Sequence, residues 1–412
     1  MLIKAKTKAG VGIQYNLTAT QNLIVEKGIS LRSIDNFGVF GEAAKQTVTV
    51  EGLIIGVDDA IRLQGVGAQV TVAAGGRILG SNDDGIELSG ANSLITNRGT
   101  IQGYYGTYQH FDGAGKATLI NHGTLIGRED AVNFDLDAGS KTLLKNFGII
   151  TAGSDDALET YDSDDTVINK GTMWGDIELG SGKDIYDGRG GILIGTVNGA
   201  DGDDLFRAGA GIERFDGGND FDTLEFRTAK ALTVDLNDNS LNTGWAKGDS
   251  YFGMDGLVGS ATGNDRLFGH DGENRLVGLG GNDLLDGRDG ADTLIGAAGK
   301  DTLTGGGGTD IFRYNALTDG GDVVTDFDPF LDTFEFARSV FKGLDLAGVL
   351  PSEQFLSGTT NKATTAAHRI IYNENNGQIW YDRDGSGVKF KGVLIATVTV
   401  GTELSNGDFL FV

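Results

Sequence analysis

The chain has 412 residues, of which 68 are glycine and only 2 are proline, and its formal net charge is −25 at pH 7. Without a G-x-y period this glycine content indicates the turns of a solenoid and excludes collagen, while the negative charge disfavours a nucleic-acid partner. No cysteine is present, which excludes a disulfide scaffold, a thiolate zinc site and a cysteine nucleophile.

The sequence shows neither the features of an N-terminal signal peptide nor those of a membrane span. Residues 1–10 contain lysines but no uninterrupted apolar core, so we expect no cleavable signal peptide there. The apolar run Val393–Val400 is typical of the chain, and it is far shorter than the roughly 18 residues of a membrane span. We therefore expect no transmembrane segment. Taken alone, these two expectations would indicate a cytoplasmic protein, but the repeats described below overrule that indication.

The first half of the chain repeats an asparagine-x-glycine motif about every 24 residues. A coil of this length suits three short strands and three turns. Residues 1–178 are therefore predicted to form a right-handed parallel β-helix with an N-terminal cap. The asparagines should stack as a ladder of hydrogen-bonded amides inside one turn. They are Asn97, Asn121, Asn146 and Asn169.

Adjacent acidic residues recur on the same coils, each pair just before an expected strand. Three interpretations of these pairs remain open. Their side chains could cap backbone N–H groups in turns, bind further calcium, or serve as acid and base on a sugar chain. The pairs are Asp58-Asp59, Asp83-Asp84, Glu129-Asp130 and Asp155-Asp156.

One coil replaces the acidic pair with Tyr104, Tyr105, Tyr108 and His110. Tyrosine rings can stack on sugars, and Tyr105, Tyr108 and His110 are candidate catalytic groups because phenol and imidazole can act as acid and base. Arg98, Lys116 and His122 are expected on flanking turns, where the first two could pair with the carboxylates of an acidic polysaccharide. The alternative is an enlarged turn with exposed aromatic rings.

Six nonapeptides follow one another without a gap from Ser260 to Arg313 and match G-G-x-G-x-D-x-U-x, where U is apolar. Each is a tight turn followed by a three-residue strand, so equivalent turns stack every 18 residues on each of two edges. Strands lie about 4.8 Å apart, and carboxylates at that spacing repel unless a hard cation such as Ca2+ lies between them. The sixth position is occupied by Asp265, Asn274, Asp283, Asp292, Asp301 and Asp310.

Imperfect copies of the nonapeptide precede this block. They place Asp184, Asp204 and Asp222 in the ligand position, and we expect Asp204 and Asp222 to bind metal. One copy has Glu213 there instead, which weakens it. Residues 179–313 are therefore predicted to form a calcium-binding β-roll in two blocks.

The region from about Gly180 to Val412 resembles the RTX (repeat-in-toxin, hemolysin-type calcium-binding repeat) family, in particular the β-roll of serralysin-type proteases. The resemblance implies folding on calcium, bacterial origin, a type I secretion apparatus as partner and an extracellular location. It implies no activity, because the protease motif H-E-x-x-H is absent. A β-helix followed by RTX repeats also resembles secreted mannuronan C5-epimerases. Residues 105–110 share the tyrosine, glycine and histidine of their Y-G-x-D-P-H motif but not its aspartate and proline.

After Arg313 the glycine content falls, and residues 314–412 are predicted to form a β-rich capping domain that covers the last coil. The segment 408–412, an acid followed by apolar residues, resembles the uncleaved signal of type I secreted RTX proteins. The predicted fold class is therefore all-β: a β-helix, a β-roll and a C-terminal capping and secretion domain.

Two functional hypotheses follow. The first is a secreted calcium-binding RTX protein that binds extracellular polysaccharide or a cell surface through its β-helix. The second is a polysaccharide-modifying enzyme (a lyase, glycosidase or epimerase) with its active site on the β-helix. Since no complete catalytic constellation is present, the sequence leaves open whether the protein is an enzyme.

Overall fold

The computed structural model describes residues 1–19, 21–227, 230–342 and 347–412. The chain divides into two compact units. Unit 1 contains Met1–Asp222 and Ser250–Gly253, and unit 2 contains Thr223–Asp249 and Met254–Val412. The expected all-β fold class is confirmed, whereas the domain boundaries at residues 178 and 313 stay predictions.

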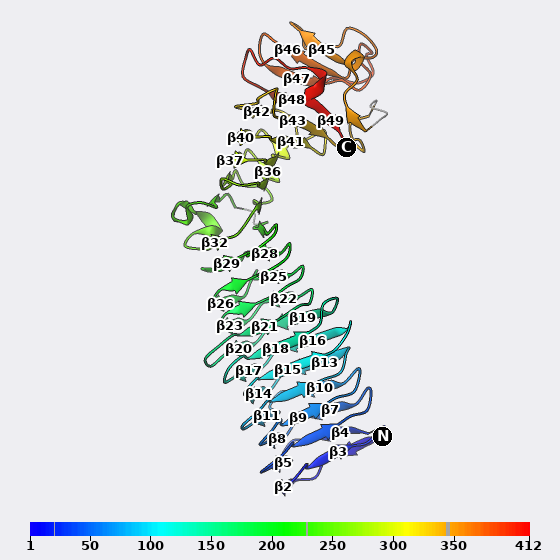
Figure 1. Cartoon of the computed structure of the whole chain (residues 1–412), viewed down its shortest axis with the longest axis vertical. Coiled ribbons are helices and arrows are strands. Elements are labelled where there is room, and N and C mark those ends of the chain that lie inside the picture. Colours follow the sequence, from blue (N-terminus) through cyan, green and yellow to red (C-terminus); the bar gives the residue numbers. More distant parts are fainter. Residues whose placement is uncertain (20, 228–229, 343–346) are drawn as a thin grey trace. The chain divides into compact units, whose positions relative to one another are not determined.

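Unit 1 is a solenoid of three parallel sheets, A, B and C, whose strands stack as rungs (Figure 1). The chain visits the sheets in turn, because each coil up to β26 supplies one strand to each. Sheet A consists of β1 (Leu2–Lys4), β4 (Asn22–Val25), β7 (Thr47–Val50), β10 (Gln69–Val72), β13 (Ser93–Asn97), β16 (Lys116–Asn121), β19 (Lys141–Asn146), β22 (Thr166–Asn169), β25 (Ile185–Asp187) and β28 (Leu205–Arg207).

The other two sheets of unit 1 follow the same order. Sheet B consists of β2 (Lys8–Gly10), β5 (Ser30–Ser33), β8 (Leu53–Gly56), β11 (Arg77–Gly80), β14 (Thr100–Gly103), β17 (Thr124–Gly127), β20 (Ile149–Thr151), β23 (Thr172–Trp174) and β26 (Ile192–Ile194). Sheet C consists of β3 (Tyr15–Leu17), β6 (Val39–Gly41), β9 (Ile61–Leu63), β12 (Ile86–Leu88), β15 (Thr107–Phe111), β18 (Val132–Leu136), β21 (Leu158–Thr160), β24 (Ile177–Glu178), β27 (Val197–Asn198), β29 (Arg214–Asp216) and β32 (Ser250–Phe252).

The expected asparagine ladder is present at the corner between sheets A and B. The side-chain amide of Asn97 donates to Asn121 Oδ1 (2.8 Å), Asn121 donates to Asn146 (2.9 Å), and Asn146 donates to Asn169 (3.0 Å). All four side chains are fully buried. The glycine two residues after each asparagine is required by the stacking, because a Cβ on Gly123 would lie 2.2 Å from the carbonyl oxygen of the coil before. The repeat thus fixes the register of unit 1.

Unit 2 begins as a two-sheet roll of parallel strands. Sheet D consists of β30 (Thr223–Glu225), β33 (Gly256–Val258), β35 (Arg275–Val277), β38 (Thr293–Ile295), β41 (Ile311–Tyr314), β43 (Thr333–Phe336) and β49 (Phe409–Phe411), with β44 (Gly348–Val349) antiparallel to β49. Sheet E starts with β31 (Thr233–Asp235), β34 (Arg266–Phe268), β37 (Leu284–Gly290), β40 (Thr302–Gly308) and β42 (Asp322–Val324).

The C-terminal region extends both sheets. Sheet E continues through β48 (Val393–Thr397), β47 (Gln378–Tyr381), β46 (Ile370–Asn373) and β45 (Phe355–Gly358). The remaining elements are the pair β36 (Gly280–Gly281) and β39 (Ala298–Gly299), and the short 3-10 helices η1 (Asn239–Leu241), η2 (Gly244–Ala246), η3 (Ser352–Gln354) and η4 (Asn406–Asp408). The expected capping function fits the aromatic column of this end. Rings of Phe312 and Phe334 lie 5.9 Å apart, and those of Phe334 and Phe409 lie 5.6 Å apart.

The apolar residue at the eighth position of every nonapeptide points inward, as expected. These residues form the core of the roll, and each is 0 or 1% exposed: Leu267, Leu276, Leu285, Leu294, Leu303 and Phe312. Because a strand alternates its side chains, their neighbours face outward. This alternation leaves the turns, and the aspartates that precede each strand, at the two edges of unit 2.

Candidate metal centre

Aspartates of unit 2 form a continuous hydrogen-bonded ladder along one edge of the roll. The backbone N–H of Asp265 donates to Asp283 Oδ1 (2.8 Å), and that of Asp283 donates to Asp301 Oδ1 (2.8 Å). The N–H of Asp301 then donates to Asp322 Oδ1 (2.9 Å). The stacking at 18-residue intervals is therefore present, and the ladder extends past the last nonapeptide.

The opposite edge carries a second ladder of the same design. Asn274 N–H donates to Asp292 Oδ1 (2.7 Å), Asp292 to Asp310 (2.9 Å) and Asp310 to Asp332 (3.0 Å). Sequence reasoning missed Asp322 and Asp332, because they lie 21 and 22 residues after their partners. The only signal was an acidic residue directly before an expected strand.

In five of the ladder residues the second carboxylate oxygen has no protein donor. Among the described residues, Oδ2 of Asp283, Asp292, Asp301, Asp310 and Asp322 is buried and accepts no hydrogen bond. Burial raises the pKa of Asp283 and Asp292 to about 7. The hydrogen bond that each carboxylate accepts from a backbone N–H of the previous coil lowers the pKa and so opposes part of this shift. A buried, unsatisfied oxygen destabilises the fold, and a bound cation would satisfy it.

Backbone carbonyls converge on the same oxygens. A Cβ on Gly278 would lie 2.3 Å from Asp283 Oδ2 and 2.9 Å from the carbonyl oxygen of Gly296. On Gly287 it would lie 2.1 Å from Asp292 Oδ2 and 2.6 Å from a carbonyl of the next coil. The first glycine of each nonapeptide thus keeps open a space faced by a carboxylate and a carbonyl oxygen. Oxygen ligands of this kind suit Ca2+.

The first rung of each ladder is different. Asp265 Oδ2 accepts hydrogen bonds from the backbone N–H (2.6 Å) and hydroxyl (2.8 Å) of Ser260, which replaces the first glycine. Asn274 is neutral, and its Oδ1 accepts the N–H of His270 (2.8 Å). Both predicted ligands lie in line with the others, but their acceptor oxygens are already bonded within the protein.

Asp204 and Asp222 form a ladder in unit 1. Asp184 N–H donates to Asp204 Oδ1 (2.8 Å), and Asp204 N–H donates to Asp222 Oδ1 (2.9 Å). A Cβ on Gly199 would lie 2.2 Å from Asp204 Oδ2 and 2.5 Å from the Gly217 carbonyl, so the same oxygen-lined space recurs. Glu213 accepts the nearby N–H of Gly209 (2.8 Å), in keeping with the imperfect repeat that contains it.

The tyrosine-histidine coil places its side chains on sheet C. The rings of Tyr105 and Tyr108 lie 5.6 Å apart, and those of Tyr108 and His110 stack at 4.6 Å. The Tyr108 hydroxyl donates to Asp135 Oδ2 (3.0 Å), and His110 Nε2 lies 2.9 Å from Glu87 Oε1. Sheet register thus gives Tyr108 and His110 each a carboxylate partner on an adjacent coil.

The electrostatics of this face favour an ionised Glu87. Its other oxygen lies 3.0 Å from Arg62 Nε, and hydrogen bonds from His110 and Asp59 outweigh burial and lower the pKa of Glu87. Burial raises the pKa values of Tyr105 and Tyr108, so both phenols keep their protons at neutral pH. Tyr108 is therefore suited to donating a hydrogen bond.

Other expected partners of this coil lie on different parts of unit 1. Arg98 lies in the turn between β13 and β14, and His122 stacks on Phe147 at 4.7 Å beside the next such turn. Lys116 opens β16 in sheet A, in register with Lys141. The expected pairing of Arg98 or Lys116 with a bound glycan stays a prediction.

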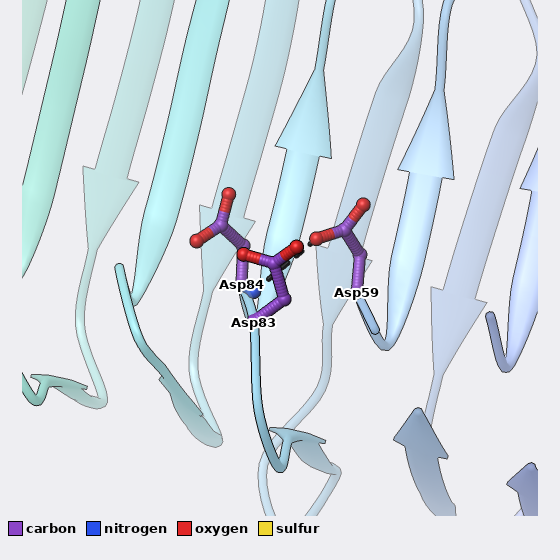
Figure 2. Close-up of side chains that lie close together, drawn as sticks. All are labelled: Asp59, Asp83 and Asp84. Atoms are coloured by element: carbon purple, nitrogen blue, oxygen red, sulfur yellow. Dashed lines mark hydrogen bonds between the residues drawn. The ribbon is translucent and has the colours of Figure 1, made fainter. Parts of the chain in front are cut away.

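The acidic pairs cap backbone N–H groups of neighbouring coils. Asp59 Oδ1 accepts the N–H of Asp84 (3.2 Å), and Asp84 Oδ1 accepts that of Tyr105 (3.1 Å). Figure 2 shows Asp59 on one coil beside Asp83 and Asp84 on the next, with carboxylate oxygens within 4.8 Å of one another. Burial raises the pKa of Asp59 to about 9 and that of Asp84 to about 8. These contacts favour the turn-capping interpretation.

The model of the RTX calcium-binding nonapeptide repeat (4 copies) matches residues 261–285 and 286–320. The chain contains RTX repeats. These RTX repeats coincide with the part of unit 2 in which both ladders are most regular.

Among solved structures, the chain is similar to the AlgE6R3 subunit from the Azotobacter vinelandii mannuronan C5-epimerase. The match has 25% identity, covers 36% of this chain and 79% of that one, and has a TM-score of 0.26. No curated protein matches the chain. Over the ranges that the structure describes, no helix is long and apolar enough to cross a membrane.

Proposed function

We propose that this is an exported, calcium-dependent RTX protein whose β-helix binds an extracellular polysaccharide on sheet C. Its export would use a type I secretion apparatus, and calcium would stabilise the β-roll outside the cell. The calcium part rests on the unsatisfied Oδ2 atoms of the RTX ladders. The polysaccharide part rests on a single observation, the continuous row of side chains on sheet C.

Calcium would act as a folding ligand. Without it, rows of buried carboxylates must stay charged and close together, or take up protons, and both reduce stability. Extracellular modules bind calcium at about 10⁻⁴ to 10⁻³ M. A protein of this type would therefore stay less ordered inside the cell and fold after export.

The row on sheet C offers one polar or aromatic side chain per coil in direct register. Glu87 and Asn133 are buried, and the other four members are partly exposed. Coils lie about 4.8 Å apart, so an extended sugar chain along the solenoid axis would meet the exposed members in succession. Most charges on this face are carboxylates, which favours a neutral polysaccharide over the acidic one expected from the sequence. The row contains Arg62, Glu87, Tyr108, Asn133, Glu159 and Glu178.

The test is retention of the calcium-loaded protein on neutral, amino-sugar and acidic polysaccharides. Tyr108→Ala removes a ring from the row and should weaken retention about tenfold or more. Phe147→Ala is a matched control, because this exposed ring lies on another corner of unit 1. Equal losses for the two variants, or no retention of the wild type on any polysaccharide, would refute the proposal.

An enzyme acting at the same face is the second candidate. It is favoured by the hydrogen bond between Tyr108 and Asp135 and by the Arg62–Glu87–His110 chain, because such pairs place an acid and a base side by side. Product formation from each polysaccharide, followed by absorbance of unsaturated sugars and by reducing ends, distinguishes the candidates. His110→Ala should abolish turnover by an enzyme but only weaken retention by a binding protein.

A further inference from the structure

The aspartate ladder of unit 1 begins one coil before any nonapeptide. The backbone N–H of Asp165 donates to Asp184 Oδ1 at 2.7 Å. In the RTX repeats the N–H of each ladder residue donates in the same way to Oδ1 of the aspartate on the next coil. The segment around Asp165 lacks the glycines of the nonapeptide, and it lies outside the residues matched by the RTX model. Backbone geometry therefore reproduces the motif where the sequence pattern has disappeared.

Both carboxylates expose an unsatisfied oxygen to the protein interior. Asp165 and Asp184 are each 1% exposed. Within the described part of unit 1, neither Oδ2 atom has a hydrogen-bond partner. Two carboxyl groups stacked at one corner, each with a buried oxygen that lacks a donor, form an arrangement that a divalent cation would complete.

A backbone carbonyl oxygen lies beside the carboxylate of Asp184, as one does beside that of Asp301 in the RTX repeats. A Cβ on Gly182 would lie 2.4 Å from the carbonyl oxygen of Ser163 and 3.0 Å from Asp184 Oδ1. In the RTX repeats, a Cβ on Gly299 would lie 1.6 Å from the Gly281 carbonyl and 3.1 Å from Asp301 Oδ1. The same pair of groups thus faces the equivalent glycine in both units.

The ladder ends at Asp165 for a visible reason. The Thr142 hydroxyl donates to Asp165 Oδ1 at 2.6 Å, and Ser163 donates to the same oxygen at 2.7 Å. Thr142 lies on the preceding coil, where an earlier member of the ladder would lie. A neutral hydroxyl there satisfies the carboxylate without adding another charge, so the column has a defined end.

We infer that unit 1 binds calcium between the Asp165 and Asp184 turns, in a column that continues toward Asp204. The site lies outside the residues matched by the RTX model, at the turns that lead from sheet C to sheet A. It makes the β-helix itself responsive to calcium, independently of the polysaccharide that this unit is proposed to bind.

The test is hydrogen exchange of the full chain with and without calcium, read by mass spectrometry in separate peptides. Calcium should slow exchange in peptides spanning residues 160–187 as well as in those spanning 260–320. Asp165→Asn keeps an acceptor for Thr142 and Ser163 but removes the charge. It should raise the calcium concentration needed for protection of residues 160–187 about tenfold or more, leaving the RTX peptides unchanged. Asp162→Asn, an exposed acid of the same turn, should have no such effect.

The outcomes separate this site from the proposed function. Protection of the RTX peptides alone would overturn the site in unit 1 and leave the calcium-dependent β-roll intact. Equal protection in wild type and Asp165→Asn would also overturn it. If calcium protects neither region, both the site and the calcium part of the proposed function fail.

A double variant of the β-roll, Asp283→Asn with Asp301→Asn, tests whether the two regions respond separately. Protection of residues 160–187 should persist in this variant. Loss of that protection would assign the effect to the β-roll.

Discussion

Single residues in the RTX turns adopt a backbone conformation that favours glycine. The second position of three successive nonapeptides is non-glycine, yet φ is 74° at Leu279, 76° at Arg288 and 67° at Ala297. This left-handed conformation costs roughly 1–2 kcal/mol for a residue with a Cβ. The turns are held in place by the stacking of their neighbours.

Ala297→Gly should relieve this strain and stabilise unit 2. We expect a gain of about 0.5–1 kcal/mol in the free energy of unfolding, since part of the relief is offset by the extra freedom of glycine in the unfolded chain. Urea unfolding in calcium measures it. Ala298→Gly, the next position, is exposed and has no positive φ, so it should destabilise slightly; a gain there too would contradict the explanation.

Asp84 should make unit 1 less stable as pH rises. Its pKa is raised from 3.8 to about 8 in the folded state, mainly by burial. Unfolding therefore releases a proton between about pH 4 and pH 8, and stability falls across that window. Asp84→Asn should remove that part of the slope and stabilise the protein by roughly 2 kcal/mol or more at pH 9.

Thermal unfolding in chelator from pH 5 to pH 9 measures the effect of this substitution. Asp58→Asn, a neighbouring and more exposed acid, is the control. A slope that is unchanged in Asp84→Asn would show that this carboxyl group is not the one that binds the proton.

The sequence predicted the residues that obey a fixed period and missed those that do not. Asp283, Asp292, Asp301 and Asp310 follow an 18-residue spacing that a reader can count. The carboxylate partners of Tyr108 and His110 lie 27 and 23 residues away, and coil length varies in unit 1. Which side chains meet therefore depends on strand register, which only the folded chain fixes.

Among elements, the corner between sheets A and B carries a continuous column of buried polar contacts. Asn146 accepts from Asn121 (2.9 Å) and Gly148 (3.1 Å) and donates to Asn169 (3.0 Å) and the Thr172 carbonyl (3.1 Å). The ladder was predictable from the repeat, because amides in one turn of a stacked coil have few other partners.

Asn146→Ala should leave buried donors and acceptors of two adjacent coils unsatisfied. We expect a loss of about 2–4 kcal/mol in the stability of unit 1, as each buried polar group left without a partner costs about 1–3 kcal/mol. Asn82→Ala removes an exposed side chain and should change stability by less than about 0.5 kcal/mol. A similar, small loss for both variants would mean that water replaces the ladder's hydrogen bonds.

For the whole molecule, calcium should determine how much of the β-roll is folded. Titrating calcium into chelated protein should raise β-sheet circular dichroism cooperatively, because each ladder residue bonds to the coils on either side. Asp283→Ala, in the middle of a ladder, should weaken this response most. Asp265→Ala should weaken it less, since Ser260 already satisfies the second oxygen of Asp265. A spectrum that does not change with calcium would rule out calcium-driven folding.

The aspartate ladders also determine which insertions and deletions this protein can tolerate. Removing residues 278–295 takes out one complete coil of 18 residues and brings Asp301 into the place of Asp283 and Asp310 into that of Asp292. Every remaining carboxylate keeps a partner, so a shortened roll should still fold. Removing nine residues instead would move every later nonapeptide to the opposite edge, so the C-terminal region would meet the roll half a coil out of place. The roll can therefore be lengthened or shortened by whole coils. Gene duplication of one coil would change the number of bound ions and leave the design of each site unaltered.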